Sequence, residues 1–400
     1  MKVVLLGAGG GMGRTAAEHL AQDSSITSLV LADYVEEAAQ RIAAGISEPK
    51  TTITPTQIDA LDKEALEALL SDADLVVNCA GPFFRLGVPT LKAAIATKTN
   101  YIDICDDPEP TKAMFALDAE ATAAGIAAVI GMGASPGLSN LLAKRAASQL
   151  DQVEDCFTAW PLGVETSGWS ENTGGTVPGS TKPSAAAVHL MEQIHGKVTI
   201  AEGGHHIDVP PLEAVQLDFP GFGSGTGYIV GHPEPLTLIS SLGLKGRSAN
   251  VIMTSKRVIS LLVELQRQLD ASGLSIEEAA SVLVKPSSRP DILETLSAQN
   301  YEDYGELPSF FALATGTLNG QRTTVGCHAA TLPSGMDGST GIPVALGAKQ
   351  MLQSKLTPGV HSPEAVINGT RLLTDLMPYC TTEVNSLDEL APVSLATTSP

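Results

Sequence analysis

Short apolar runs alternate with amphipathic stretches along the first 135 residues of the chain. The runs are rich in Val, Ile, Leu and Ala, and the stretches between them carry apolar residues at helical spacing. The runs that predict strands are 3–7, 28–33, 51–59, 74–80, 101–105 and 126–131. Strands of a parallel sheet that is covered by helices on both faces have this nearly continuous apolar pattern. The pattern therefore predicts an α/β Rossmann domain with a doubly wound parallel sheet.

The pattern changes after Ser135. A hairpin is predicted at 309–332, because Asn319-Gly320 supplies the positive φ angles of a tight turn. The remaining predicted elements are helices at 138–150, 185–196 and 256–269 and short strands at 154–162, 197–202, 226–231 and 235–240. This middle region is predicted to be an α+β domain with a mixed or antiparallel sheet.

Helical patterns return at 340–352 and 362–376, and the last dozen residues are expected to form a frayed tail. A chain of 400 residues is too long for one ordinary core, so two or three domains are expected.

The charge balance limits the partners that the protein can have. The chain has 44 acidic and 24 basic side chains, a formal net charge of −20. Such a surface repels phosphate, so neither nucleic acid nor an anionic membrane is expected to bind. The five cysteines are scattered without zinc spacing, which favours reduced thiols and no metal site. The apolar runs at 3–6 and 123–134 are too short for a signal peptide or a membrane span, so we expect a cytoplasmic protein.

A glycine-dense turn, GAGGGMG, lies between the first predicted strand and the first predicted helix. Its spacing is G-x-x-G-x-x-G, which suits a tight turn, close backbone approach to a pyrophosphate, and free N–H groups at a helix N-terminus. The alternative is a turn that needs glycine only for close packing. The predicted cofactor contacts in this turn are Gly7, Gly9, Gly10, Gly11, Met12 and Gly13.

Asp33 ends the second predicted strand, twenty residues after Gly13. A carboxylate at this point accepts hydrogen bonds from the ribose hydroxyls and repels a 2′-phosphate. Since no Arg or Ser follows Asp33, we predict NAD as the cofactor in preference to NADP.

The fourth predicted strand ends in the sequence NCAGPFFRLG. Ligands of doubly wound sheets bind at the carboxyl ends of the strands, so Asn78, Cys79, Ala80 and Gly81 are predicted along the nicotinamide half of the cofactor. Cys79 is expected to be a packed thiol and not a reactive one. Arg85 follows, and it is either a bidentate partner for a substrate carboxylate or a surface residue.

The segments GAGGGMG, NCAGPF, YIDIC and GMGASPGLSN resemble the saccharopine dehydrogenase-like reductases, and TGIPVALGAKQML resembles the closing helix of that family. The resemblance implies a Rossmann domain at 1–135 plus about 338–390, interrupted by a substrate and dimerisation domain at 136–337. It also implies hydride exchange between a nicotinamide and an amine/imine pair.

Two departures from the saccharopine reductases bear on the substrate. The resemblance places that subgroup's aspartate on Ser135 and its cysteine on Thr173, so both ionisable groups proposed for proton handling are missing. Saccharopine is therefore not the expected substrate. The segment ASPGLSN is closer to the NAD-linked lysine 6-dehydrogenase type, in agreement with Asp33.

The proton donor or acceptor should titrate near neutral pH, which favours a histidine or a carboxylate in an apolar cleft. His232, between a glycine and a proline at a strand end, is the first candidate, with a structural histidine as the alternative. Asp106 follows the fifth strand and could bind an ammonium group, while Asp107 beside it could instead cap a helix. Glu234 could orient His232, although alternating neighbours along a strand point to opposite sides. His189 and His195 do not share a helix face, which argues against a metal site there.

The glycine-rich loop 163–180 has the character of a binding loop or lid, with disorder as the alternative. Its glycines would let backbone amides approach a carboxylate, and its tryptophan could cover a substrate chain. The substrate contacts predicted here are Trp169, Asn172, Thr173 and Gly174, in addition to Ser135 and Arg85.

The sequence as a whole predicts an NAD(P)-dependent oxidoreductase acting on a C–N bond of an amino acid or polyamine-like amine, assembled as a homodimer. Two alternatives stay open. One is an oxidoreductase of a C=C or C–O bond on the same scaffold, and the other is a dinucleotide-binding sensor without catalysis.

Overall fold

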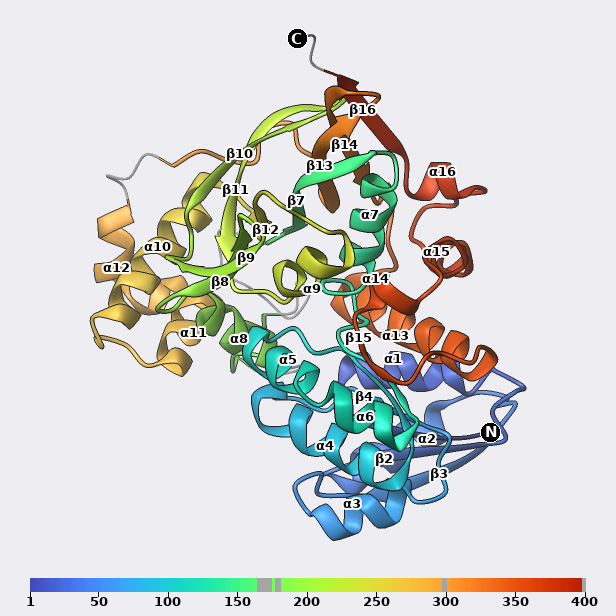
Figure 1. Ribbon diagram of the computed structural model, residues 1–400. Coiled ribbons are helices and arrows are strands. Elements are labelled where there is room, and N and C mark those ends of the chain that lie inside the picture. The colour runs from blue at the N-terminus through green and yellow to red at the C-terminus, as the bar shows by residue number, and fades with distance from the viewer. Residues whose placement is uncertain (164–174, 177–180, 297–300, 398–400) are drawn as a thin grey trace. The chain divides into compact units, whose positions relative to one another are not determined.

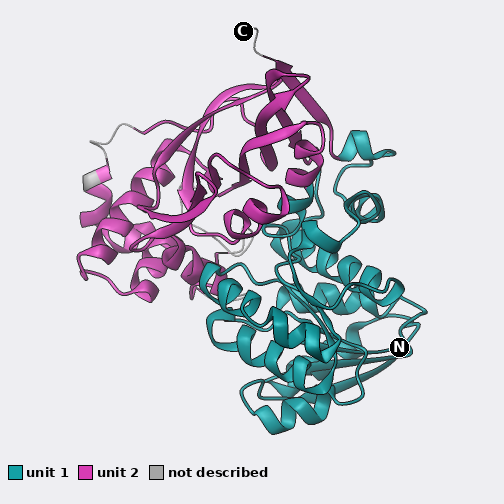
Figure 2. Ribbon diagram, viewed as in Figure 1, with its two compact units in different colours: residues 1–141, 331–390 teal, residues 142–330, 391–400 magenta. Residues whose placement is uncertain are grey.

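The computed structural model describes residues 1–163, 175–176, 181–296 and 301–397. These residues divide into two compact units, drawn in different colours in Figure 2. Unit 1 contains residues 1–141 and 331–390, and unit 2 contains residues 142–330 and 391–400.

Unit 1 is built on a seven-stranded sheet in the order β15-β6-β5-β4-β1-β2-β3, and every recorded pairing in it is parallel. The first six strands follow the Rossmann order 3-2-1-4-5-6, whose ligand crevice lies at the carboxyl ends beside β1 and β4. The strands are β1 (Lys2–Leu6), β2 (Ser28–Asp33), β3 (Thr52–Gln57), β4 (Leu75–Asn78), β5 (Asn100–Asp103), β6 (Ala127–Val129) and β15 (Gly359–His361). The predicted doubly wound sheet is confirmed, and β15 adds a strand that the apolar pattern did not predict.

Helices pack against both faces of this sheet (Figure 1). The neighbouring helices α3, α4, α5 and α6 form one group, while α1 and α13 pack against each other in another. The helices are α1 (Gly11–Leu20), α2 (Glu36–Gly45), α3 (Lys63–Leu70), α4 (Phe83–Thr97), α5 (Pro108–Phe115), α6 (Asp118–Ala124), α13 (Gly335–Gln353), α14 (Pro363–Val366), α15 (Gly369–Leu376) and α16 (Leu387–Leu390). Helix α7 (Leu138–Ala147) crosses the boundary between the units.

Unit 2 contains a nine-stranded mixed sheet with the path β10-β11-β12-β7-β13-β14-β16, to which β8 and β9 attach at β12. Strands β7 and β12 run parallel, and the other recorded pairs are antiparallel. The strands are β7 (Gln152–Pro161), β8 (Val198–Glu202), β9 (His205–Val209), β10 (Ala214–Phe219), β11 (Gly223–Val230), β12 (Ser248–Met253), β13 (Phe311–Leu318), β14 (Gln321–His328) and β16 (Val393–Thr397). This is the predicted α+β domain with a mixed sheet.

The core of unit 2 is a cluster that includes Phe157, Ile200, Ile229, Val251 and Phe311 from five different strands. The turn between β13 and β14 has φ angles of +51° at Asn319 and +77° at Gly320, so the predicted hairpin is confirmed. The helices of this unit are α8 (Ala185–Gln193), α9 (Glu234–Ser241), α10 (Lys256–Asp270), α11 (Ile276–Val284) and α12 (Pro290–Thr295).

Two predicted elements are wrong. Residues 235–240 form most of α9 and not a strand, because Pro235 in the first turn favours helix initiation. The expected frayed tail contains the end of α16 and the whole of β16, and β16 pairs antiparallel with β14. Leu395 of β16 stays 53% exposed, so an apolar pattern could not reveal this edge strand.

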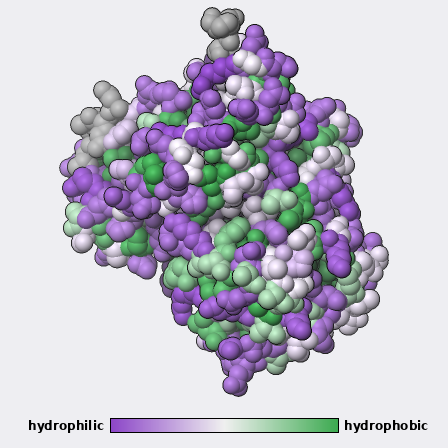
Figure 3. Space-filling model, in the orientation of Figure 1, coloured by the Kyte–Doolittle hydropathy of each residue, from purple (hydrophilic) through white to green (hydrophobic). Residues whose placement is uncertain are grey.

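On the face shown in Figure 3, hydrophilic residues predominate and apolar residues are interspersed among them. Within the described part of the chain, no helix is both long and apolar enough to cross a bilayer.

Candidate functional site

The glycine turn of unit 1 connects β1 to α1 and is held against β2. The amides of Gly7 and Ala8 donate to the Ala32 carbonyl, and the Gly10 amide donates to the Gly7 carbonyl. Gly7 has a φ of +75°, and a Cβ at this position would lie 2.7 Å from the backbone nitrogen of Ala80. Glycine is therefore required here for the turn and for close approach to the strand beside it.

The first turn of α1 presents backbone amides without a side-chain cap, because the N-cap residue is Gly10. Gly13 packs on the carbonyl of Gly7, and Gly341 of α13 packs on the carbonyl of Met12. A helix N-terminus with free amides and a positive dipole end binds phosphate groups. The turn therefore fits a dinucleotide pyrophosphate.

Asp33 lies half-buried at the end of β2, where the ribose-binding carboxylate was predicted. Its Oδ2 accepts a 2.8 Å hydrogen bond from the Gly9 amide, and its Oδ1 accepts a 3.0 Å bond from the Val35 amide. Glu36 and Glu37 follow in the first turn of α2. These carboxylates make the surroundings of Asp33 negative.

The carboxyl ends of β4 and β5 are joined by buried hydrogen bonds. The Tyr101 hydroxyl donates to Asp103 Oδ2 at 2.8 Å and accepts from Asn78 Nδ2 at 3.1 Å. Asp103 Oδ1 accepts from the amides of Cys105 and Gly131. Burial raises the pKa of Asp103 to about 7, against the opposing effect of these hydrogen bonds. Asp103 thus ties three strand ends of the sheet together.

The predicted nicotinamide contacts lie directly after β4. The amide group of Asn78 is fully buried, and its Oδ1 accepts from the Ala80 amide at 3.0 Å. Burial raises the pKa of the Cys79 thiol to about 12, so this thiol is protonated at neutral pH, as expected of a packed cysteine. Gly81 is exposed before Pro82, and Arg85 is exposed in the first turn of α4.

Ser135 lies half-buried in the loop between β6 and α7, before Pro136. The loop is fixed by Asn140, whose Oδ1 accepts from the Gly137 amide at 2.9 Å. Asn140 Nδ2 in turn donates to Glu364 Oε2 of α14 at 2.9 Å, and both side chains are buried. The C-terminal part of unit 1 therefore holds the loop that carries Ser135.

Asp106 and Asp107 lie between β5 and α5 in unit 1. The charge of Asp106 is among the causes that raise the pKa of Asp103. Asp107 is the N-cap residue of α5, but its side chain makes no capping hydrogen bond.

His232 of unit 2 lies in the turn between β11 and α9 and is 3% exposed. Its Nδ1 lies 2.7 Å from Glu234 Oε2, and Glu234 is fully buried in the first turn of α9. A carboxylate only accepts hydrogen bonds here, so Nδ1 carries the proton and Nε2 is the nitrogen left for proton exchange. The position of Glu234 in a helix explains why strand alternation does not separate it from His232.

Glu234 is held by Asn250 of β12, which is itself held by residues of β7. Its Oε1 accepts from Asn250 Nδ2 of β12 at 3.0 Å, and the same Nδ2 donates to Thr158 Oγ1 of β7 at 3.0 Å. Trp160 Nε1 donates to Asn250 Oδ1 at 2.8 Å. We call Thr158, Trp160, His232, Glu234 and Asn250 the His232 network. A buried network with paired polar groups fixes the orientation of the imidazole.

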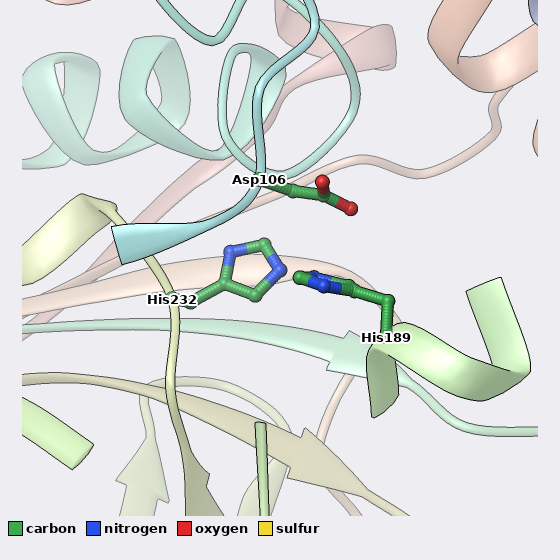
Figure 4. Close-up of side chains that lie close together, drawn as sticks. All are labelled: Asp106, His189 and His232. Carbon is green, nitrogen blue, oxygen red and sulfur yellow. The ribbon is translucent and has the colours of Figure 1, made fainter. Parts of the chain in front are cut away.

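A second imidazole lies beside this network. The rings of His189 and His232 are 6.4 Å apart between centroids in an edge-on arrangement, and Figure 4 shows the two imidazoles turned toward each other. His189 Nε2 lies 2.6 Å from Nε2 of Gln193, one turn further along α8. Asp106, also drawn in Figure 4, belongs to unit 1.

Sequence reasoning missed His189, Asn250 and Thr158 as neighbours of His232. Strands β7 and β12 are largely apolar in the sequence. An apolar run does not reveal that Thr158 and Asn250 lie opposite each other when these strands pair. Trp169, Asn172, Thr173 and Gly174 lie outside the described residues, so their predicted roles stay predictions.

The fold and the glycine turn are those of an α/β domain of the dinucleotide-binding type. Residues 3–129 match the family model described as the saccharopine dehydrogenase NADP binding domain. The predicted resemblance to the saccharopine dehydrogenase-like proteins is therefore confirmed over this part of the chain.

Known relatives support the same assignment. The chain is 24% identical over 387 residues to the carboxyaminopropylagmatine dehydrogenase of a Synechocystis strain. The aligned residues make up 88% of this chain and 89% of that protein. A trans-acting enoyl reductase of Mycobacterium leprae is 34% identical over 103 residues, only 26% of this chain and 24% of that protein. The apo saccharopine dehydrogenase (L-Glu forming) of Saccharomyces cerevisiae has the same fold over the whole of both chains, with a TM-score of 0.62 and 16% identity.

Proposed function

We propose that the protein is an NAD-linked oxidoreductase of a C–N bond in an amino acid or polyamine-like amine. The observation that carries the proposal is the 2.7 Å contact between His232 and Glu234 inside unit 2. A histidine oriented by a buried carboxylate is a common general acid or base. The name of the carboxyaminopropylagmatine dehydrogenase, a relative over most of the chain, supports an amine substrate.

Each residue has a defined task in this proposal. The bound nicotinamide supplies or accepts the hydride. His232 takes the proton from the substrate ammonium through Nε2, and Glu234 stabilises the imidazolium that results. Asp106 is proposed to bind a substrate ammonium group, while Arg85 and Ser135 are proposed substrate contacts. Asp33 favours NAD because its carboxylate would repel a 2′-phosphate, and Glu36 and Glu37 add negative charge in the first turn of the helix that follows.

Oxidation or reduction of a C=C bond is a second candidate, because several relatives are trans-acting enoyl reductases. The matched stretches cover only about a quarter of the chain, 26% in both cases. The amine substrate is preferred because the relative that supports it matches over 88% of the chain.

The test is to incubate the pure protein with NAD, and separately with NADP, and a panel of L-lysine, other diamino acids and polyamines. Formation of reduced nicotinamide with one amine, together with ammonia or a second amine, is the expected result. The reverse direction is assayed with NADH, a keto acid and an amine, and with NADH and an enoyl thioester.

The outcomes separate the alternatives. NADH oxidation with the enoyl thioester would favour the C=C reaction, and NADH oxidation by the keto acid without consumption of the amine would favour the C–O reaction. Dinucleotide binding without turnover in any arm would contradict an enzyme of this class and favour a sensor.

A further inference from the structure

Asp337 lies against the glycine turn from a distant part of the chain. It belongs to the first turn of α13, and a Cβ added to Gly11 would overlap both of its carboxylate oxygens. Asp337 Oδ2 also lies 3.4 Å from Nη2 of Arg14 on α1, in an ion pair whose two side chains are about half exposed. An acidic side chain of unit 1 therefore fills the space that a side chain at position 11 would take.

This space lies over the first turn of α1. Cα–Cβ bonds of a helix tilt toward its N-terminus, so a group beside the Cβ position of Gly11 is at the end of α1 where amides are free. The same end carries the positive pole of the helix dipole and attracts anions. Asp337 thus places a fixed negative charge where the pyrophosphate of a dinucleotide is expected, and it holds the neighbouring cation, Arg14.

We propose that Asp337 is an affinity-determining residue that competes with the dinucleotide pyrophosphate for Arg14 and for the first turn of α1. In the free protein, Asp337 pairs with Arg14. When the dinucleotide binds, its pyrophosphate becomes the partner of Arg14, and the Asp337 carboxylate turns toward solvent, to which it is already half exposed. Dinucleotide affinity is then lower than the glycine turn alone would give, which favours release of the cofactor. The inference rests on the dinucleotide binding of the proposed function.

The test is equilibrium titration with NADH, followed by nicotinamide fluorescence, for the full-length wild type and four variants. Asp337→Asn removes the competing charge, and we expect it to bind NADH about three- to tenfold more tightly. Asp337→Ser, which also removes the charge, should do the same. Arg14→Gln removes the cation and should weaken binding about three- to tenfold.

Glu120→Gln is the matched control, since Glu120 is an exposed carboxylate on α6 of the same unit and its removal changes the net charge equally. We expect its affinity to equal that of the wild type. Unchanged or weaker binding by both Asp337 variants would overturn the inference, as would equal tightening by Glu120→Gln. Failure of the wild type to bind either NADH or NADPH would instead contradict the proposed function itself, and the inference with it.

Discussion

The glycine turn of unit 1 and the His232 network of unit 2 are built in opposite ways. The turn consists of backbone amides and carbonyls that approach closely because side chains are absent at Gly7 and its neighbours. The network consists of side chains from two strands, a helix and the turn before that helix, and its buried carboxylate and amide groups are paired by hydrogen bonds. The turn is therefore damaged by adding atoms, and the network by removing them.

The largest expected effect is on the network. Glu234→Ala removes the buried acceptor for both His232 and Asn250, so we expect unit 2 to lose about 3–5 kcal/mol in its free energy of unfolding. Urea unfolding followed by tryptophan fluorescence measures this loss. Glu213→Ala is the control, because Glu213 pairs with Arg247 at the surface and should contribute about 1 kcal/mol or less. Equal losses in the two variants would contradict the account.

Adding a methyl group should damage the turn. Gly7→Ala places a Cβ 2.7 Å from the Ala80 backbone at a φ of +75°, and we expect a loss of about 2–3 kcal/mol in stability together with loss of NADH binding. Gly45→Ala is the matched control, because a Cβ there meets open space and its φ is ordinary. Thermal unfolding and NADH titration of both variants check the prediction. NADH binding by Gly7→Ala at wild-type affinity would show that the turn does not need its close approach.

Asp103 gives unit 1 a pH dependence. The pKa of Asp103 is about 7 in the folded protein, against 3.8 for an unperturbed aspartate. Because the pKa is raised in the folded protein, protonated Asp103 makes its full contribution to the free energy of unfolding below pH 3.8. This contribution is lost as the pH rises to about 7. Between pH 5 and 7 we expect the loss to be about 2 kcal/mol. Asp103→Asn, which resembles the protonated acid, should not show this loss in urea unfolding at the two pH values. A wild type and a variant with the same pH dependence would contradict the raised pKa.

The smallest effect tests a single bond of the network. Trp160→Phe keeps an aromatic ring but removes the 2.8 Å hydrogen bond to Asn250, and we expect a loss of about 1 kcal/mol in stability. Chemical unfolding followed by circular dichroism measures it. No loss at all would mean that the bond does not help to hold Asn250.

Most of the fold could be predicted because the strands of unit 1 are buried on both faces and form apolar runs in the sequence. The exceptions have physical reasons. Strand β15 has only three residues, and β16 lies at a sheet edge with Leu395 exposed, so neither leaves an apolar run. Helix α9 was predicted as a strand because the alternation of Leu236, Thr237 and Leu238 suits either structure.

The candidate site likewise contains a part that the sequence predicts and a part that it does not. The glycine turn and Asp33 were predicted because their spacing is local in the chain. The His232 network was only half predicted, since Asn250 and Glu234 meet 16 positions apart and Asn250 and Thr158 meet 92 apart. Tertiary pairing of β12 with β7 brings these side chains together, and no local pattern encodes it. Likewise, Asp337 reaches Arg14 from 323 positions away through the packing of α13 on α1.

The most direct test of the central claim is to compare turnover and cofactor binding in His232→Gln, with the amine that the substrate panel identifies. His206→Gln is the matched control, because His206 is an exposed histidine of the same unit, on β9. The account predicts that His232→Gln lowers kcat about 10²- to 10³-fold and leaves the Kd for NADH within about twofold of the wild type, while His206→Gln changes neither. A His232→Gln protein that turns over at the wild-type rate would contradict the assignment of His232 as the proton acceptor.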